Sequence, residues 1–366
     1  MKNLIKKYII QLIFYFLSLI KIYFYRATRK IKIKKLTNFS KKKHSFILVF
    51  ASYSELLEES SKQLLRRFRN GGGYIVFVSN YLNHKIYLDK NTPIDVFINS
   101  NGLGRDFGPF KIATNYISEK IGKNIPEKVI YTNDSVFYVG GSRGNIFLDD
   151  LLNSEFDYVG LFENSGDDLI AKKWFVSTWY FSVSKTFFLS KVYQKFFRTY
   201  TPHNLKFHAV LIGEVGLSQV ALNFSSRLKV IFNNELLINL AKNFVKKHGV
   251  DEFMKYMPSP FKRNYWLENK INNSNLVISY LEQNLYLYSP THIFNIFLLY
   301  QKKFFYVKKD LFYSGHYEYN HFNLLEKSLF FINWRQKLEL IRSLRIKGMP
   351  GDYSIYKIIK TKLELE

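Results

Sequence analysis

The chain has 366 residues, of which 47% are hydrophobic and 18% aromatic, so it can bury a large core and does not resemble a disordered segment. It contains no cysteine, which excludes a disulfide framework, a thiolate zinc site and a cysteine nucleophile. The formal net charge of +25 attracts polyanions, but no RNP strand or C₂H₂ pattern accompanies it, and no nucleic-acid partner is expected.

The first segment, residues 1–43, combines an apolar stretch with a basic tract. Residues 8–25 predict a helix of about 27 Å at roughly 1.5 Å per residue, just short of a bilayer core. The cations that follow favour the anionic cytoplasmic leaflet. We therefore expect a membrane anchor or interfacial helix. A signal peptide and a buried soluble helix are the alternatives.

Strand and helix signals then alternate. Strands are expected at 45–52, 74–80, 95–101, 128–135 and 156–163, and helices at 55–68 and 106–121. This alternation predicts an α/β fold with a mostly parallel sheet and helices on both faces. After about residue 225 the pattern is helical, with segments at 235–249, 280–288, 293–312 and 324–344. We expect a helical C-terminal extension there.

Small polar residues end two of the predicted strands. They are Asn99, Ser100 and Asn101 at the end of 95–101, and Asn133, Asp134 and Ser135 at the end of 128–135. Ligands of parallel sheets bind beyond the carboxyl ends of the strands, so these residues should lie at one site. The Asp134 carboxylate could hold a divalent cation, and through it a diphosphate. The alternative is an Asx turn that only caps the chain.

The segment 99–111 is rich in glycine and leads into a predicted helix. Gly102, Gly104 and Gly108 allow close backbone approach, and Arg105 and Lys111 add cations. A phosphate would suit such a helix start. The glycine spacing matches neither a Walker loop nor a dinucleotide fingerprint. An ordinary strand-to-helix loop is the alternative.

Two later segments carry further candidates. Residues 174–197 predict an aromatic strand and then a helix from about Ser184, whose aromatic side chains either stack on a sugar or pack in the core. Glu214, in the segment 212–222, is a lone acid before a short apolar helix. It is a candidate general base, and the alternative is a helix-start cap.

Four of these segments occur in an order that resembles a known family. "NGLGRDFGPFK", "YTNDSVFY", "STWYFSVSKTFF" and "GEVGLSQVAL", followed by the proline-plus-lysine region 288–312, resemble the rhamnan synthesis protein F family. These are bacterial glycosyltransferases of cell-surface polysaccharide assembly. The resemblance runs from about residue 46 to about residue 312. It implies a GT-A-like nucleotide-sugar domain at 44–224, between the anchor at 1–43 and the extension at 225–366.

The resemblance also implies a reaction and its residues. A nucleotide sugar, with dTDP-L-rhamnose as one candidate, would give its sugar with inversion to a lipid-linked glycan. The site would lie at the cytoplasmic face of the bacterial inner membrane. Glu214 would be the base, Asp134 would hold Mg²⁺ or Mn²⁺, and Trp179 and Tyr180 would bind the acceptor. The implied donor-binding residues are Asn101, Gly104, Arg105, Asp106, Lys111, Asn133, Asp134 and Ser135.

Two departures from the family pattern stand in the sequence. The strand end carries one carboxylate rather than a pair, which bears on metal dependence, and "NSN" replaces an Arg-Glu-Asn lead, which bears on the donor. Lys308 and Lys309 are expected as solvated surface charges, with phosphate contact as the alternative. A non-catalytic membrane-associated scaffold of polysaccharide assembly is the second functional hypothesis.

Overall fold

The structure is a computed structural model. It describes most of the chain between residues 31 and 317. The described ranges are 31–39, 44–54, 57–80, 91–100, 102–141, 144–153, 155–164, 174–225, 227–269, 273–285, 288–313 and 316–317, with single positions from 13 to 23 and from 321 to 338. Most of the predicted helices at 8–25 and 324–344, and Asn101, lie outside the described residues.

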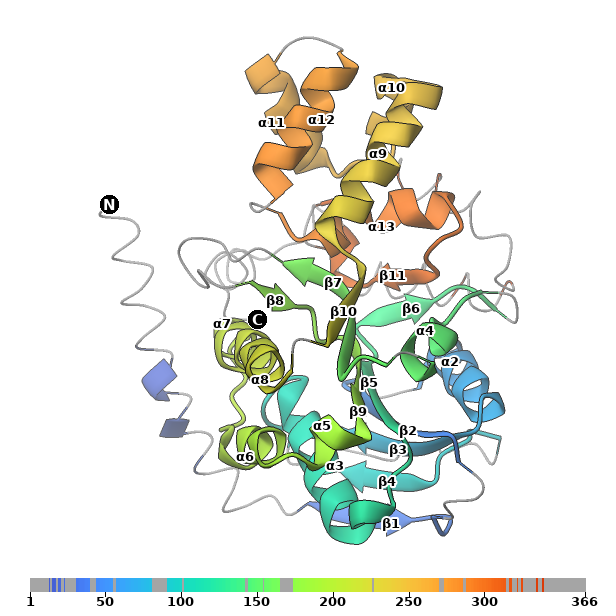
Figure 1. The fold of residues 1–366 in the computed structure, drawn as a ribbon, viewed down its shortest axis with the longest axis vertical. Coiled ribbons are helices and arrows are strands. Elements are labelled where there is room, and N and C mark those ends of the chain that lie inside the picture. The colour runs from blue at the N-terminus through green and yellow to red at the C-terminus, as the bar shows by residue number, and fades with distance from the viewer. Residues whose placement is uncertain are drawn as a thin grey trace.

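A nine-stranded mixed sheet forms the centre of the molecule (Figure 1). Its strands are, in spatial order, β1 (Lys32–Lys35), β4 (Val96–Asn99), β3 (Gly73–Ser79), β2 (Phe46–Ser52), β5 (Lys128–Asn133), β9 (Tyr180–Ser184), β7 (Tyr158–Asn164) and β10 (Leu228–Phe232), with β8 (Phe175–Val176) paired to β7. Strands β2, β3, β4, β5, β7 and β10 run in one direction, and β1, β8 and β9 run in the other. The predicted α/β fold with a mostly parallel sheet is therefore confirmed.

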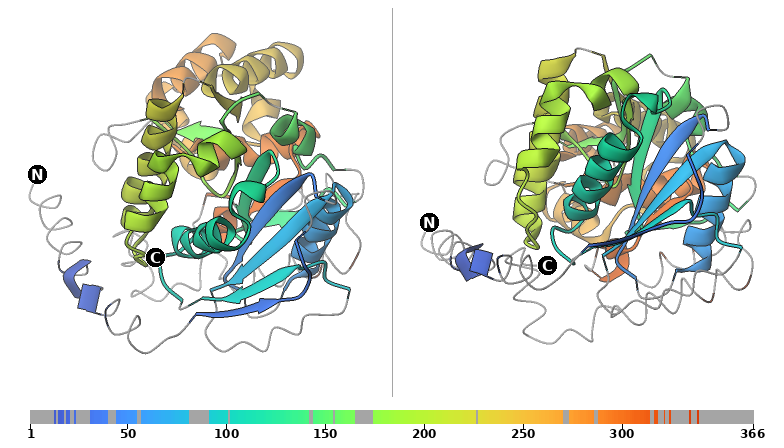
Figure 2. Two further views of the ribbon diagram at one scale, coloured as in Figure 1. Left: turned by 60° about the horizontal axis from the view of Figure 1, so that its bottom comes forward. Right: turned by 90° about the horizontal axis from the view of Figure 1, so that it is seen from below.

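Both faces of the central strands β2, β3 and β5 are buried because these strands are apolar on both sides. In β2, Ile47 and Val49 belong to one core cluster, whereas Leu48 and Phe50 belong to the other. This alternation follows from the two-residue period of a strand. Helices on the first face are α3 (Phe107–Lys120), α5 (Lys185–Leu189), α6 (Lys191–Thr199) and α8 (Gly216–Phe224) (Figure 2). The opposite face is covered by elements that include α2 (Glu59–Asn70), α4 (Leu148–Leu152) and α13 (Pro290–Tyr300).

The region after residue 225 is mostly helical but contains two strands that were not predicted. Strand β10 joins the main sheet beside β7, and β11 (Tyr306–Lys308) pairs with β6 (Val136–Tyr138) in a second, two-stranded sheet. The remaining elements are α9 (Asn234–His248), α10 (Val250–Met254), α11 (Ser259–Asn269), α12 (Ser274–Asn284) and α14 (Asp310–Tyr313). Because β6 directly follows β5, its pairing with β11 brings the segment around residue 308 to the carboxyl end of β5.

One long helical segment carries Glu214, the predicted base. It runs from α7 (Lys206–His208) through a π-helical stretch, η3 (Ala209–Val215), into α8. The helix thus begins earlier than predicted, and Glu214 lies within it rather than at its start, so the predicted alternative of a helix-start cap is wrong. By length and composition alone, Lys206–Phe224 could cross a membrane. This is weak support for a span, because core helices pass the same test and 39% of the segment is buried in the protein.

Candidate active site

The carboxyl ends of the parallel strands meet along one edge of the sheet. In the register, Ser52 lies beside Ser79, Ser79 lies beside Asn99, and Ala51 lies beside Asn133. The polar residues that follow these strands therefore share that edge. The predicted convergence of the segments after residues 99 and 133 is confirmed.

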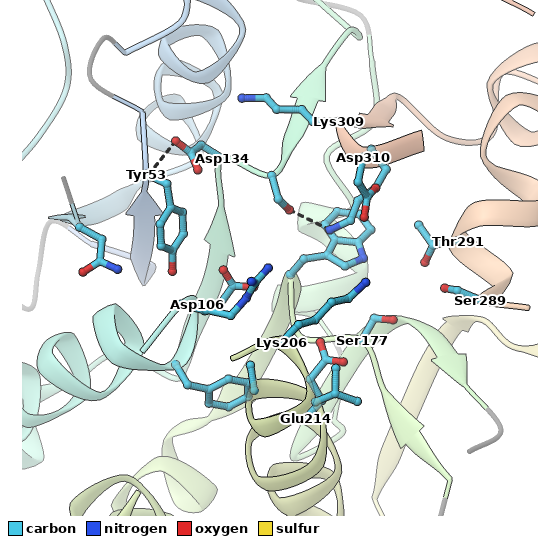
Figure 3. A pocket seen from close by; sticks show the side chains of 18 of the residues that line it. Tyr53, Asp106, Asp134, Ser177, Lys206, Glu214, Ser289, Thr291, Lys309 and Asp310 are labelled. Carbon is cyan, nitrogen blue, oxygen red and sulfur yellow. Dashed lines mark hydrogen bonds between the residues drawn. The ribbon is translucent and has the colours of Figure 1, made fainter. Parts of the chain in front are cut away.

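A cavity of about 740 Å³ lies beyond this edge. Six of the predicted site residues line it, namely Arg105, Asp106, Asp134, Ser135, Trp179 and Glu214. Asp134 and Glu214 thus line the same cavity, which the roles predicted for them require. Figure 3 shows Tyr53, Asp106 and Asp134 on one side of it, and Ser177, Lys206 and Glu214 on another.

Asp134 is fixed by hydrogen bonds from the end of β2. Its Oδ2 accepts from the Ser52 hydroxyl at 2.9 Å, from the Tyr53 N–H at 2.9 Å and from the Ser54 N–H at 3.0 Å. The Asx turn belongs to Asn133 instead, whose Oδ1 accepts from the Ser135 N–H at 2.9 Å. The carboxylate of Asp134 therefore ties two strand ends together beside the cavity.

These contacts bear on the predicted metal site. Mg²⁺ and Mn²⁺ need several oxygen ligands, and one oxygen of Asp134 is already used by three donors. The neighbouring Ser135 hydroxyl accepts a hydrogen bond from Lys308 Nζ at 2.8 Å, which places a cation at this point. Within the described part of the chain, no three His, Asp or Glu side chains are grouped to hold a metal ion. The described residues fit a divalent cation poorly.

The glycine-rich turn has a packing role that the sequence did not reveal. Gly104, at φ +89°, leaves no room for a side chain, because a Cβ there would lie 2.5 Å from Pro202 and 2.8 Å from the Gly108 backbone. Its N–H donates to Asn204 Oδ1 at 2.7 Å. The next residue, Arg105, also has a positive φ, of 45°, an unfavourable conformation for a residue with a side chain. The turn thus packs the chain against itself and presents Arg105 to the cavity.

Lys111 and Tyr180, two residues predicted for the site, lie elsewhere. Lys111 Nζ donates to the carbonyl oxygens of Arg198 and Tyr200, both at 2.8 Å, and so caps the end of α6. Tyr180 is fully buried, and its hydroxyl donates to the Ile146 carbonyl. Neither residue lines the cavity, nor do Gly104 and Asn133, so their direct ligand roles are not supported.

Asp106 is half-buried at the start of α3 and faces the Tyr53 side of the cavity (Figure 3). Burial raises the pKa of its carboxyl group, although the charges of Lys308 and Arg105 act in the opposite direction. Burial raises the pKa of the Tyr53 hydroxyl, and the nearby Asp106 carboxylate raises it further. This half of the cavity therefore combines two acids, Asp106 and Asp134, with two cations, Arg105 and Lys308.

Glu214 is held by a single residue of the loop before β9. Its Oε1 accepts from the Thr178 N–H at 3.1 Å and from the Thr178 hydroxyl at 2.9 Å. Burial raises the pKa of Glu214, and these two hydrogen bonds oppose the rise without cancelling it. A positioned carboxylate with a raised pKa is a stronger proton acceptor than an exposed one.

Lys308 and Lys309 are not the solvated charges that the sequence suggested. Lys309 is buried and its Nζ pairs with Glu58 Oε2 at 2.6 Å. Lys308 Nζ donates to Ser135 and lies 5.5 Å from the ring centroid of Trp179. Both lysines line the cavity, so the expectation of surface exposure is wrong.

Several cavity residues were missed at the sequence level. They are Tyr53, Ser54, Asn80, Asn164, Ser177, Asn204, Lys206, Ser289, Thr291, His292 and Asp310. Asn80 could have been found, since it is the last residue of the predicted strand 74–80 and lies at the same sheet edge. The residues after 288 carry no comparable local signal, because only the pairing of β11 with β6 brings them here.

Comparison with known proteins adds nothing to this geometry. No family model matches the chain, and no curated protein matches it. The resemblance to the rhamnan synthesis protein F family therefore stays a prediction from the sequence.

Proposed function

We propose that the chain is a GT-A-like glycosyltransferase that moves a sugar from a nucleotide donor to a hydroxyl group of a glycan acceptor. The observation that carries the proposal is that Asp134 and Glu214 line one cavity with Arg105 and Lys308 at the carboxyl edge of the sheet. Parallel α/β sheets bind ligands at this edge. A cavity that mixes acids and cations suits a substrate with both a diphosphate and hydroxyl groups.

In the proposed reaction, the donor diphosphate lies near Arg105 and Lys308. The bond between the anomeric carbon and the diphosphate oxygen breaks, and both bonding electrons stay with the departing nucleoside diphosphate. Its negative charge grows in the transition state, where fixed cations stabilise it more than they stabilise the bound donor. Asp134 supports this half indirectly, because it holds Tyr53 and Ser54 at the cavity wall.

Glu214 is the proposed base. Its carboxylate takes the proton of the acceptor hydroxyl while the oxygen of that hydroxyl forms the new bond to the anomeric carbon. Attack from the face opposite the diphosphate inverts the configuration. The hydrogen bonds from Thr178 leave Oε2 of the same carboxylate for the proton.

Membrane association of the enzyme belongs to the same proposal. In the described part of the basic tract, Lys32, Lys34 and Lys35 on β1 are all exposed. Exposed lysines are attracted to anionic lipid, at about 1 kcal/mol per charge near the surface. We place the enzyme at the cytoplasmic face of the bacterial inner membrane, beside a lipid-linked acceptor.

The test is incubation of the purified chain with a panel of nucleotide sugars, including dTDP-L-rhamnose, with and without bacterial membrane lipid extract. The expected result is release of a nucleoside diphosphate from one donor, stimulated by the extract. A non-catalytic scaffold would release none from any donor, and that result would reject the proposal.

A further inference from the structure

The part of the cavity contributed by the C-terminal region has its own chemistry. We call the residues Ser289, Thr291, His292 and Asp310 the C-terminal wall; they come from the start of α13 and the start of α14. In Figure 3 the side chains of Ser289, Thr291 and Asp310 lie across the cavity from Tyr53 and Asp134, and those of Lys206, Ser177 and Glu214 lie lower in the view.

Two polar atoms of this wall are buried without a hydrogen-bond partner among the described residues. They are Thr291 Oγ1 and Asp310 Oδ1. Thr291 is only 2% exposed. A buried hydroxyl or carboxylate oxygen without a partner is unfavourable, and native structures rarely keep one without a reason. Two such atoms on one wall of one cavity indicate that a ligand supplies the missing hydrogen bonds.

The charges of the wall indicate what kind of ligand this is. Asp310 Oδ2 lies 3.4 Å from His292 Nε2. Burial raises the pKa of Asp310. The charge of His292, and to a smaller extent those of Lys308 and Lys206, lower this pKa by more, so the carboxyl group is ionised. Its free oxygen can only accept. Because this oxygen only accepts, the group of the ligand that binds it must be a hydrogen-bond donor, such as a hydroxyl group.

The Thr291 hydroxyl differs from this carboxylate in the hydrogen bonds that it can make. It can donate one hydrogen bond and accept another, whereas Asp310 Oδ1 only accepts. A ligand satisfies both atoms if one of its groups donates to Asp310 Oδ1 and another donates to, or accepts from, the Thr291 hydroxyl. Adjacent hydroxyl groups of a sugar ring have this property, and the Ser289 hydroxyl in the same wall adds a third polar contact.

We infer that the C-terminal wall is the subsite for the acceptor sugar, where Asp310 and Thr291 bind ring hydroxyl groups of a neutral carbohydrate and direct another hydroxyl towards Glu214. The inference rests on the proposed function and deepens it, since it names the acceptor chemistry. It also moves acceptor recognition away from Tyr180, which is buried elsewhere.

The test is a binding measurement that needs no turnover. Saturation-transfer NMR on the full chain would be recorded with methyl glycosides of L-rhamnose, D-mannose, D-galactose and N-acetyl-D-glucosamine. Binding of dTDP would be measured by calorimetry in parallel. The variants are Thr291→Val and Asp310→Asn. The matched controls are Thr199→Val and Asp149→Asn, both at exposed positions.

One glycoside should bind the wild type, and each wall variant should weaken it about fivefold to tenfold, the effect of one buried hydrogen bond. The controls and the affinity for dTDP should not change. Thr291→Val keeps the side-chain shape and removes an unpaired hydroxyl, so its thermal midpoint should equal or exceed that of the wild type. Weaker sugar binding in this variant is then not a folding defect.

Equal sugar binding by the wild type and Thr291→Val would overturn the inference. So would a wild type that turns over a nucleotide sugar but binds none of the glycosides, and in that case the proposed function would stand. If a glycoside binds the wild type and binds Thr291→Val and Asp310→Asn more weakly, while no nucleotide sugar is turned over, the sugar subsite is supported and the transferase proposal fails.

Discussion

Asp134 offers the sharpest test of how this site is built, because its carboxylate joins two strand ends. The sequence alone suggests that Asp134→Ala should abolish donor turnover and leave unfolding nearly unchanged. The structure changes this expectation. One oxygen of Asp134 accepts three hydrogen bonds, two of them from the backbone N–H groups of Tyr53 and Ser54.

The magnitude follows from those two N–H groups. The Ser52 hydroxyl can rotate to another partner, but the backbone donors cannot without movement of the chain. A hydrogen bond to a charged group contributes about 1.5–3 kcal/mol, and the lower value applies because Tyr53 and Ser54 are only half-buried. Two such bonds amount to about 3 kcal/mol of the free energy of unfolding. At an m-value of about 3 kcal/mol/M, the urea midpoint should fall by about 1 M.

The assay is urea unfolding followed by far-UV circular dichroism, with Asp134→Asn and the exposed Asp149→Asn as comparisons. Asp134→Asn keeps an acceptor oxygen in place and should lose about half as much stability as Asp134→Ala. Asp149→Asn should change the midpoint little. A midpoint for Asp134→Ala within about 0.2 M of the wild type would refute the role of this carboxylate in joining the strand ends.

Four further predictions concern the proposed reaction and its substrate. Glu214→Gln should lower turnover at least about 100-fold and change the affinity for the nucleotide donor little. The exposed Glu119→Gln is the control and should change neither quantity. Near-normal turnover of Glu214→Gln would reject Glu214 as the base. Because burial raises the pKa of Glu214, the wild-type rate should fall on acidification through a pKa above the ordinary value of 4.5, since the protonated acid cannot accept the proton; a rate that is flat down to that value would contradict this. Lys308→Met should weaken the binding of a nucleoside diphosphate about tenfold, as measured by calorimetry, whereas the exposed Lys303→Met should not change it. Turnover should persist in EDTA, and a loss of activity that Mg²⁺ restores would contradict metal independence.

Much of the central sheet could be predicted from local pattern. The strands near 45–52, 74–80, 128–135 and 156–163 are apolar runs bounded by polar or glycine residues, and each corresponds to a strand of the structure. The helix at 106–121 was equally clear, with Pro109 in its first turn. The strands β10 and β11 were missed, because short strands between helical segments have no period long enough to detect.

The candidate site was predicted in part. The rule that polar residues gather at the carboxyl ends of parallel strands found Asp134 and Ser135, the glycine-rich helix start found Arg105, and the family resemblance added Asp106. The glycine-rich segment did not separate residues that face the cavity from neighbours that face away, so Lys111 was included as well. A flexible lysine next to a predicted site can point either way, and its direction depends on the carbonyl groups that α6 leaves open nearby.

By itself, the sequence determined most strands of the central sheet, the helix at 106–121 and which strand ends carry polar groups, since these properties depend on neighbours a few positions apart. Only the tertiary structure decided what surrounds those groups. Lys308 reaches Ser135 across 173 positions of the chain, and Asp134 meets Ser52 across 82. Contacts of this range depend on the order and direction in which elements pack, and no local pattern encodes that path.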